Sequence, residues 1–300
     1  MNGVATPKVG YAPELVCSLT GYTQITKVPN NAGVKPETSR SLTFGVAFEP
    51  VKDLTLTLDY WRTQIDSVIG NRAIDYILAN PSVYPGLFLR NADGTLGVVS
   101  SSGFKDAVVN TPSNVGSMRG AGLDGSIKYS SPRADWGRIT AGIDVAYLTR
   151  WDARSEGVNN GNWVSALGFF NDVVPVNPNA GLSNATRGLN NRWRHTAQVA
   201  WQSHDWLVQL SQRYQSKIYD QNLAAATGTG TSGARFVSAY EQFNLLVRYS
   251  GLKNTKLSLG VSNLLNDQPP LTNHNAYRGY LTSVADVLGR AYVLTAEYRY

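Results

Sequence analysis

Residues 120–125 read GAGLDG, which has the G-x-G-x-x-G spacing of a dinucleotide-binding glycine motif. In that motif the glycines let the backbone approach a pyrophosphate, and they lie between a strand and a helix. Here the stretch SIKYS, residues 126–130, follows the glycines and has the pattern of a strand. We therefore interpret the glycines as part of a strand, and the sequence predicts no nucleotide or other cofactor.

The three histidines, His195, His204 and His274, could act as metal ligands or as a catalytic base. Their separations fit no metal-binding motif, and the single cysteine, Cys17, can form neither an internal disulfide nor a cysteine-rich metal site. The local pattern places His195 on an outward strand face and His204 in a tight turn. A serine–histidine–aspartate set can be chosen from any chain of this composition. We expect no catalytic residue, no metal and no enzymatic activity.

The composition favours strands and turns over helices. The 300 residues include 28 glycines, 16 tyrosines and 7 tryptophans, and only 16% are charged. The formal charge of +6 is carried by single basic residues without a lysine–arginine block, which argues against a nucleic-acid partner. No run of about 18 apolar residues could form a transmembrane helix. The opening residues MNGVATPKVG lack the pattern of a secretory signal, so an exported protein would begin upstream of Met1.

Nine stretches alternate apolar and polar residues with the period of a β-strand. They cover residues 42–49, 54–61, 122–129, 138–151, 192–202, 206–213, 242–249, 257–262 and 291–300. The one helix that the pattern favours is a short one within residues 69–80, inside a loop. The nine strands predict an all-β fold.

The clearest alternation spans residues 138–151. Its apolar series includes Ile143 and Trp151, and its polar series includes Thr140 and Arg150. In the wall of a membrane barrel the apolar series faces lipid and the polar series faces the lumen. We therefore expect Ile143 and Trp151 to face lipid, and Thr140 and Arg150 to face the lumen.

The connections between the strands alternate between short and long. The short ones are EPVKD, SPRADWG, SHD and SGLKNT, and the long ones lie near residues 67–115, 152–190, 220–234 and 266–288. In an antiparallel meander every second connection lies on the same side, so all long loops share one side. Together with aromatic residues at the strand ends, this predicts an up-and-down transmembrane β-barrel segment with short periplasmic turns and long extracellular loops. The alternative is a soluble all-β protein with half-buried sheets, which has no reason to sort its loops.

Four segments, residues 34–39, 48–66, 263–267 and 289–300, together resemble the C-terminal part of a TonB-dependent receptor barrel. Residues 34–39, VKPETS, are similar to the family's "LKPETS" segment, and FEPVKDLTLTLDYWRTQID, residues 48–66, is similar to the hairpin that follows it. NLLND, residues 263–267, resembles the family's "NLF(D/N)" element, and Gly289-Arg290 with an aromatic terminus resembles its final strand. The family's barrel has about 22 strands, and its "LKPETS" segment precedes roughly the last nine. The resemblance thus implies a partial barrel.

The resemblance also implies a division of the chain and a function. Residues 1–33 would be the remnant of an extracellular loop, residues 34–300 the C-terminal part of the barrel, and the plug domain with its TonB box would be absent. The parent protein would take up a scarce ligand, a ferric siderophore or an oligosaccharide, across the outer membrane of a Gram-negative bacterium. The fragment alone would not transport. The alternative is a passive porin-like barrel, which needs no plug.

Two sets of residues are expected to carry the function. Ligand contacts would come from the long loops and the upper lumen, with Asp144, Arg150, Trp163, Arg192 and Arg194 as candidates. Barrel closure and the assembly signal would depend on the last strand, through Tyr292, Leu294, Tyr298 and Tyr300. The expected partners are outer-membrane lipid and lipopolysaccharide, the barrel assembly machinery, and the TonB complex through the missing plug only.

Overall fold

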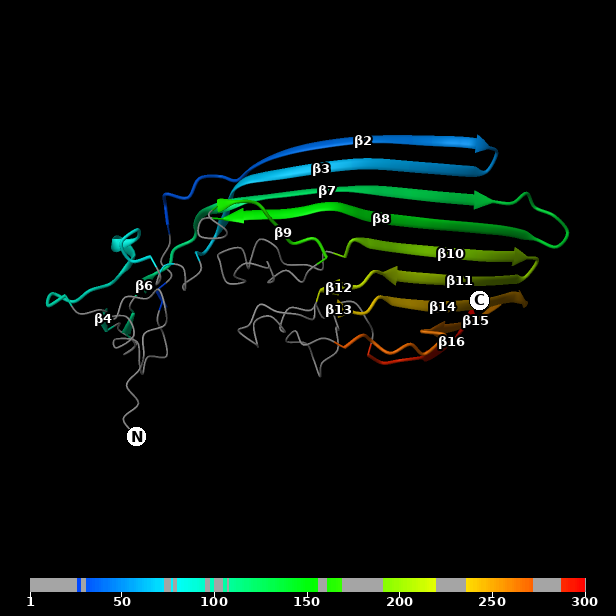
Figure 1. Ribbon diagram of the computed structural model, residues 1–300. Coiled ribbons are helices and arrows are strands. Elements are labelled where there is room, and N and C mark those ends of the chain that lie inside the picture. Colours follow the sequence, from blue (N-terminus) through cyan, green and yellow to red (C-terminus); the bar gives the residue numbers. More distant parts are fainter. Residues whose placement is uncertain are drawn as a thin grey trace.

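The computed structural model describes residues 26–27, 31–72, 77, 80–94, 98–99, 105–106, 108–155, 161–168, 191–219, 236–271 and 287–299. Nine long strands form an antiparallel sheet in which each strand pairs with the next along the chain (Figure 1). They are β2 (Thr38–Val51), β3 (Leu54–Gly70), β7 (Ser113–Ser130), β8 (Arg138–Ser155), β10 (Trp193–Ser203), β11 (Trp206–Gln215), β14 (Tyr240–Leu252), β15 (Thr255–Ser262) and β16 (Ala291–Tyr298). The nine predicted strands and the all-β meander are confirmed.

Short strands accompany this sheet. β9 (Val164–Ser165) pairs with the end of β8, while β1 (Thr26–Lys27) pairs with β6 (Val108–Val109), β4 (Val98–Val99) with β5 (Lys105–Asp106), and β12 (Ile218–Tyr219) with β13 (Phe236–Val237). A 3₁₀ turn covers Pro85–Leu87. The helix expected within residues 69–80 is wrong at its start, because Ile69 and Gly70 belong to β3. Ile77 has helical backbone, and most of the remaining segment lies outside the described residues.

The tight turns gather at one end of the sheet, as the loop lengths predicted (Figure 1). Three of these turns have only two residues between their strands, and each contains a residue with positive φ: Asp53 at 66°, His204 at 45° and Asn254 at 57°. Asp, Asn and His tolerate this left-handed conformation better than other residues that carry a Cβ. Two-residue turns of this kind fix the register of a hairpin.

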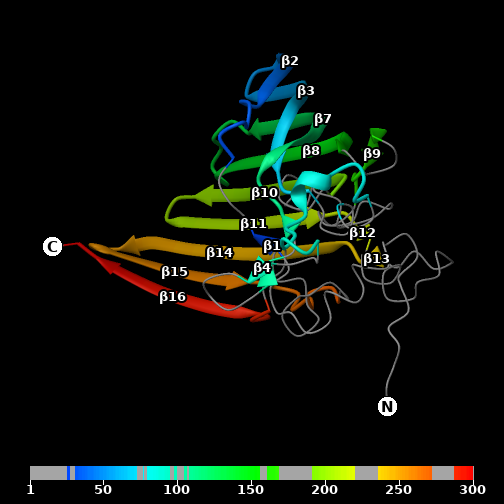
Figure 2. The ribbon, with the colours of Figure 1, turned by 90° about the vertical axis from the view of Figure 1, so that its left-hand side faces the viewer.

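The sheet is open at both edges. Among the described strands β2 pairs only with β3, and β16 pairs only with β15. Seen along the sheet, the strands follow one another from β2 to β16 without returning to β2 (Figure 2). The structure is therefore a partial barrel, as predicted.

The two faces of the sheet differ in polarity, because residues paired across neighbouring strands project to the same side. One such row runs Phe44–Tyr60–Leu123–Tyr147–Trp193, and a parallel one runs Phe48–Leu56–Ile127–Ile143–Ala197. Several of these side chains are exposed, Phe44 to 72% and Phe48 to 59%, and the others are half-buried. The opposite face carries the row Thr57–Ser126–Asp144–Thr196–Arg213. An exposed apolar face opposite a polar one is the pattern of a membrane barrel wall.

Several strands run well beyond the predicted ends. β3 continues to Gly70 and β7 already begins at Ser113, so the loop between them is shorter than the expected residues 67–115. On these extensions the polarity of the faces is reversed. A buried apolar cluster of Val68, Met118 and Ala153 lies on the face that is polar further down, with Trp151 packed against it. The arginines of the extensions project to the opposite side.

Candidate functional site

A hollow of about 670 Å³ opens on the polar face of the sheet. Five neighbouring strands, β3, β7, β8, β10 and β11, contribute to its wall, so this face is the concave, lumenal one. Its charged residues are three acids and two bases: Asp59, Asp124, Asp144, Arg194 and Arg213. Groups of both signs in an open, wet concavity suit the binding of a polar ligand or of another protein surface.

Two of the predicted ligand residues, Asp144 and Arg194, meet in this hollow. Asp144 is paired with Thr196 and Arg194 with Ala146, so the two lie on adjacent rows of the same face. Asp144 also faces Lys128 at 3.9 Å, with both side chains 65% exposed. An ion pair that is this open to water contributes little to stability, about 0–1 kcal/mol. The carboxylate of Asp144 is therefore available to solvent and to a ligand.

Arg192 lies beside the hollow without lining it. Its carbonyl oxygen accepts a hydrogen bond from the backbone N–H of Leu148 at 2.9 Å, and its side chain is exposed. The hollow is lined instead by Asp59, Asp124 and Arg213, which the sequence did not single out. The sequence shows how these residues alternate with apolar neighbours on their own strands. It does not show the register between strands that long loops connect, so it could not predict that these residues lie together.

Arg150 is on the other face, which corrects the expected lumenal position. The pairing of β7 with β8 shifts by one residue between Ala121 and Gly122, since Gly122 is paired with Leu148 and Ala121 with Arg150. The extra residue, Thr149, forms a β-bulge. The bulge reverses the alternation beyond it, so Arg150 projects to the same side as Tyr147. For the same reason Trp151 does not face lipid as expected: it packs on the concave side against the cluster of Val68, Met118 and Ala153.

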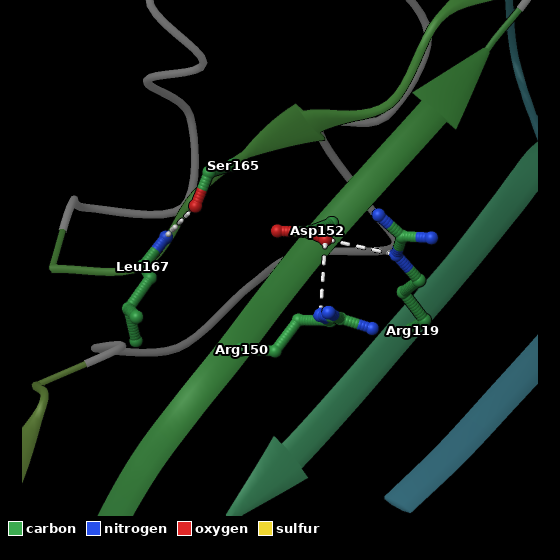
Figure 3. A network of polar contacts seen from close by, with 5 residues as sticks. All are labelled: Arg119, Arg150, Asp152, Ser165 and Leu167. Atoms are coloured by element: carbon green, nitrogen blue, oxygen red, sulfur yellow. Dashed lines mark hydrogen bonds and ion pairs between the residues drawn. The ribbon is translucent and has the colours of Figure 1, made fainter.

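Trp163 also lies with the outward arginines rather than in the lumen. Its indole ring is under the guanidinium of Arg119 at 4.2 Å and near that of Arg154 at 4.9 Å. Asp152 joins this group, because its Oδ2 is 2.8 Å from Nε of Arg119 and 3.7 Å from Nε of Arg150 (Figure 3). The five predicted ligand residues thus divide between the two faces of the sheet.

The GAGLDG motif makes room for two tryptophans. A Cβ on Gly120 would lie 2.9 Å from the ring of Trp151, and a Cβ on Gly122 would lie 2.9 Å from the ring of Trp61. Both glycines are inside β7, which confirms the prediction that the motif is part of a strand. The two indoles form an aromatic wall above the hollow, on the concave side.

His195 takes part in a chain of polar groups on the outward face. Nε1 of Trp193 donates a hydrogen bond to Nδ1 of His195 at 2.8 Å, and Nε2 of His195 is 3.2 Å from Oε1 of Gln212. The amide nitrogen of Gln212 donates in turn to Glu241 at 2.9 Å. His195 is therefore held between Trp193 and Gln212.

The residues expected to close the barrel lie on the free edge. Tyr292, Leu294 and Tyr298 are in β16 and are 66%, 79% and 61% exposed, whereas Tyr300 lies outside the described residues. In the described part of the chain no group of three or more His, Cys, Asp or Glu could hold a metal ion. No described helix is long and apolar enough to cross a membrane.

The sequence model of the family described as "TonB dependent receptor-like, beta-barrel" matches residues 8–264. The chain belongs to this family. TonB-dependent receptors are transport receptors and not enzymes, and the meander, the polar concave face and the apolar convex face are those of their barrels. No match was found among curated proteins.

Solved structures agree with the TonB-dependent receptor fold at low sequence identity. A mutant of the ferric enterobactin receptor PfeA from Pseudomonas aeruginosa is similar with a TM-score of 0.53 and 17% identity over 89% of this chain and 31% of that one. The FrpB iron transporter from Neisseria meningitidis is similar with a TM-score of 0.52 and 15% identity over 92% of this chain and 32% of that one. The siderophore receptor PirA from Acinetobacter baumannii is similar with a TM-score of 0.52 and 16% identity over 88% of this chain and 32% of that one. The chain thus spans about a third of the length of each of these receptors.

Proposed function

We propose that the chain forms the C-terminal part of the barrel of a TonB-dependent receptor in the outer membrane of a Gram-negative bacterium. The observation that carries the proposal is the sheet itself. It has an apolar convex face, a charged concave hollow and, among the described strands, two free edges, β2 and β16. Backbone groups at a free edge cannot face lipid without a cost of several kcal/mol each. Further strands must therefore pair with both edges before the wall can close.

The proposed substrate is a scarce ligand, a ferric siderophore or an oligosaccharide. The similar structures favour the siderophore, since they are those of a ferric enterobactin receptor, an iron transporter and a siderophore receptor. The mixed charges around Asp144 and Arg194 and the wall of Trp61 and Trp151 would offer the ligand both polar and aromatic contacts. No bond is made or broken in the transport that we propose.

The proposed partners follow from this location. Outer-membrane lipid would meet the convex face, and the barrel assembly machinery would read the last strand. The TonB complex would act through a plug domain, which we place outside residues 34–300. Residues 1–33 would belong to an extracellular loop.

The proposal is tested by deleting the encoding gene segment in the source bacterium and growing the cells under iron limitation with one ferric siderophore at a time. We expect growth on one siderophore to be lost and to return with the restored gene. A porin-like barrel predicts another result: unchanged growth on every siderophore with slower entry of small hydrophilic solutes. That result would contradict the receptor proposal.

A further inference from the structure

The outward face of β3, β7 and β8 changes from apolar to basic on the long-loop side of the row Phe44–Tyr60–Leu123–Tyr147–Trp193. The row that contains Tyr60 and Tyr147 is followed by one that contains Arg62, Ala121 and Arg150, two residues further along each strand except where the bulge adds a third. Two residues of a strand span roughly 7 Å. The arginine side chains of this row are therefore attached to the strand within one side-chain length of the aromatic residues.

The apolar band below this step has the dimensions of a bilayer. On β8 the outward residues from Ile139 to Tyr147 extend roughly 26 Å along the strand at about 3.3 Å per residue. Tilting the strand by about 40° reduces this to about 20 Å, close to the apolar band of roughly 25 Å on membrane barrels. Tyr60, Tyr147 and Trp193 thus lie where aromatic side chains meet the headgroups on the side of the long loops.

A small cleft lies in the basic region. It has a volume of about 150 Å³, and its wall includes Tyr60, Arg62, Arg119 and Arg150, with the buried Ala121 between them. Three arginines from three adjacent strands therefore border one concavity on the outside of the sheet. Its position follows from the bulge at Thr149, since without that extra residue Arg150 would project into the lumen.

Two of the three guanidinium groups are held in place. Arg119 and Arg150 both approach Oδ2 of Asp152 through Nε, and Arg119 also lies over the ring of Trp163. Pairing through Nε leaves the two Nη groups of each fork for another acceptor. Asp152 is only 13% exposed, so it organises the arginines from beneath and does not cover them. Arg62 is exposed and has no ion pair among the described residues.

The charge of the surrounding surface is positive. Five arginines project outward from the upper parts of β2, β3, β7 and β8, against two aspartates, Asp66 and Asp152; the arginines are Arg40, Arg62, Arg119, Arg150 and Arg154. Both aspartates are engaged: Asp66 accepts hydrogen bonds from the side-chain amide of Gln64 at 3.0 and 3.1 Å. Because arginines outnumber acidic groups on this surface at headgroup depth, the surface favours binding of an anionic group from the membrane.

We infer that the cleft bordered by Arg62, Arg119 and Arg150 binds a phosphate of a lipopolysaccharide headgroup in the outer leaflet. Arginine forks bind phosphate through paired hydrogen bonds, and Tyr60 would contact the glycan or acyl part of the same molecule. A lipid is favoured over a soluble anion because the cleft faces outward and directly adjoins the apolar band. The inference rests on the proposed outer-membrane location, but it concerns the convex face and is independent of the imported ligand.

The test uses the full chain in detergent micelles with three probes: lipid A that carries both phosphates, lipid A without them, and inorganic phosphate. The first variant combines Arg62→Gln, Arg119→Gln and Arg150→Gln. Its control combines Arg138→Gln, Arg248→Gln and Lys256→Gln, which remove the same charge from the concave face. We expect phosphorylated lipid A to bind the first variant on the order of tenfold more weakly than wild type, because charge-assisted hydrogen bonds are lost. The control should bind like wild type.

Far-UV circular dichroism shows whether the first variant keeps its sheet. If it does not, Arg62→Gln alone replaces it, since Arg62 is exposed and makes no ion pair in the described structure; we then expect binding a few-fold weaker. Equal affinity of wild type for lipid A with and without phosphates would overturn the inference. So would equal losses in the variant and the control, or inorganic phosphate binding as tightly as the lipid. None of these results bears on siderophore-dependent growth, so the receptor proposal is tested separately.

Discussion

The indole of Trp61 lies over Gly122 on the concave side of the sheet, where a Cβ on the glycine would be 2.9 Å from the ring. The same Cβ would lie 2.9 Å from the backbone oxygen of Tyr147 on the next strand. The glycine therefore allows a tryptophan on one strand and the backbone of another to approach the same point of β7.

Gly122→Ala should destabilise the folded sheet, because neither the ring nor the paired strand can move aside without a loss of contacts. We expect a loss of roughly 1–3 kcal/mol in the free energy of unfolding, measured by urea denaturation in micelles. Gly142→Ala is the matched control on the same face, since the nearest atom to its Cβ would be at 3.6 Å. Equal stability of the two variants would show that the close approach has no energetic importance.

The two faces of β8 can be tested with one substitution at two positions. Ile143→Arg introduces a charge into the apolar row with Ile127 and Ala197, and should reduce folding into lipid vesicles by ~2–4 kcal/mol. Thr140→Arg lies on the polar face and should be far milder. The measurement is the heat-modifiable fraction of the full-length parent receptor on a gel after incubation with vesicles. The same loss at both positions would mean that the assigned faces are wrong.

Asp152 should matter more for stability than Asp144, although both carboxylates are on β8 and both face a basic residue. Asp152→Asn weakens the hold on Arg119 and Arg150 at a half-buried position, where hydrogen bonds to charged groups contribute about 1.5–3 kcal/mol. Asp144→Asn removes an exposed pair at 3.9 Å, for which we expect roughly 0–1 kcal/mol. Urea unfolding in micelles compares them, and a larger loss for Asp144→Asn would contradict the geometry.

Deleting Tyr300 from the full-length parent receptor should impair membrane insertion if this residue is part of the assembly signal. Tyr300→Phe keeps an aromatic ring at the interface and should insert normally, whereas Tyr300→Ser should behave like the deletion. The heat-modifiable, membrane-inserted amount of each variant in cells makes the comparison. Normal insertion of the deletion variant would leave the terminal residue without the role that we predict for it.

The strands and their order could be predicted because each hairpin carries its own signals. Period-2 alternation marked the strands, and short polar turns such as residues 203–205 joined them. The upper ends of β3 and β7 were missed for a physical reason: beyond the apolar band the polar and apolar faces change places. Arg62, Gln64 and Asp66 follow Leu58 and Tyr60 on the same face, so an apolar series appears to stop where the strand continues.

Only part of the site could be predicted from the sequence. Asp144 and Arg194 were placed on the polar face by simple alternation, which holds on regular strands. Arg150 was misplaced because a bulge is a single extra residue, Thr149, that leaves no mark in composition or periodicity. The contact of Trp163 with Arg119 depends on a loop that returns beside β8, and no local pattern encodes such a return.

The most direct test of the open sheet is the conductance of the chain by itself in a planar lipid bilayer. In the described structure one edge of β2 and one edge of β16 have no partner strand. We therefore expect no stable unitary conductance from the purified chain, at concentrations where a complete receptor or porin of known activity inserts and is recorded in the same chamber. A discrete, long-lived conductance from a monomer of this chain would contradict it, because nine strands with two free edges would then have closed a barrel without further strands.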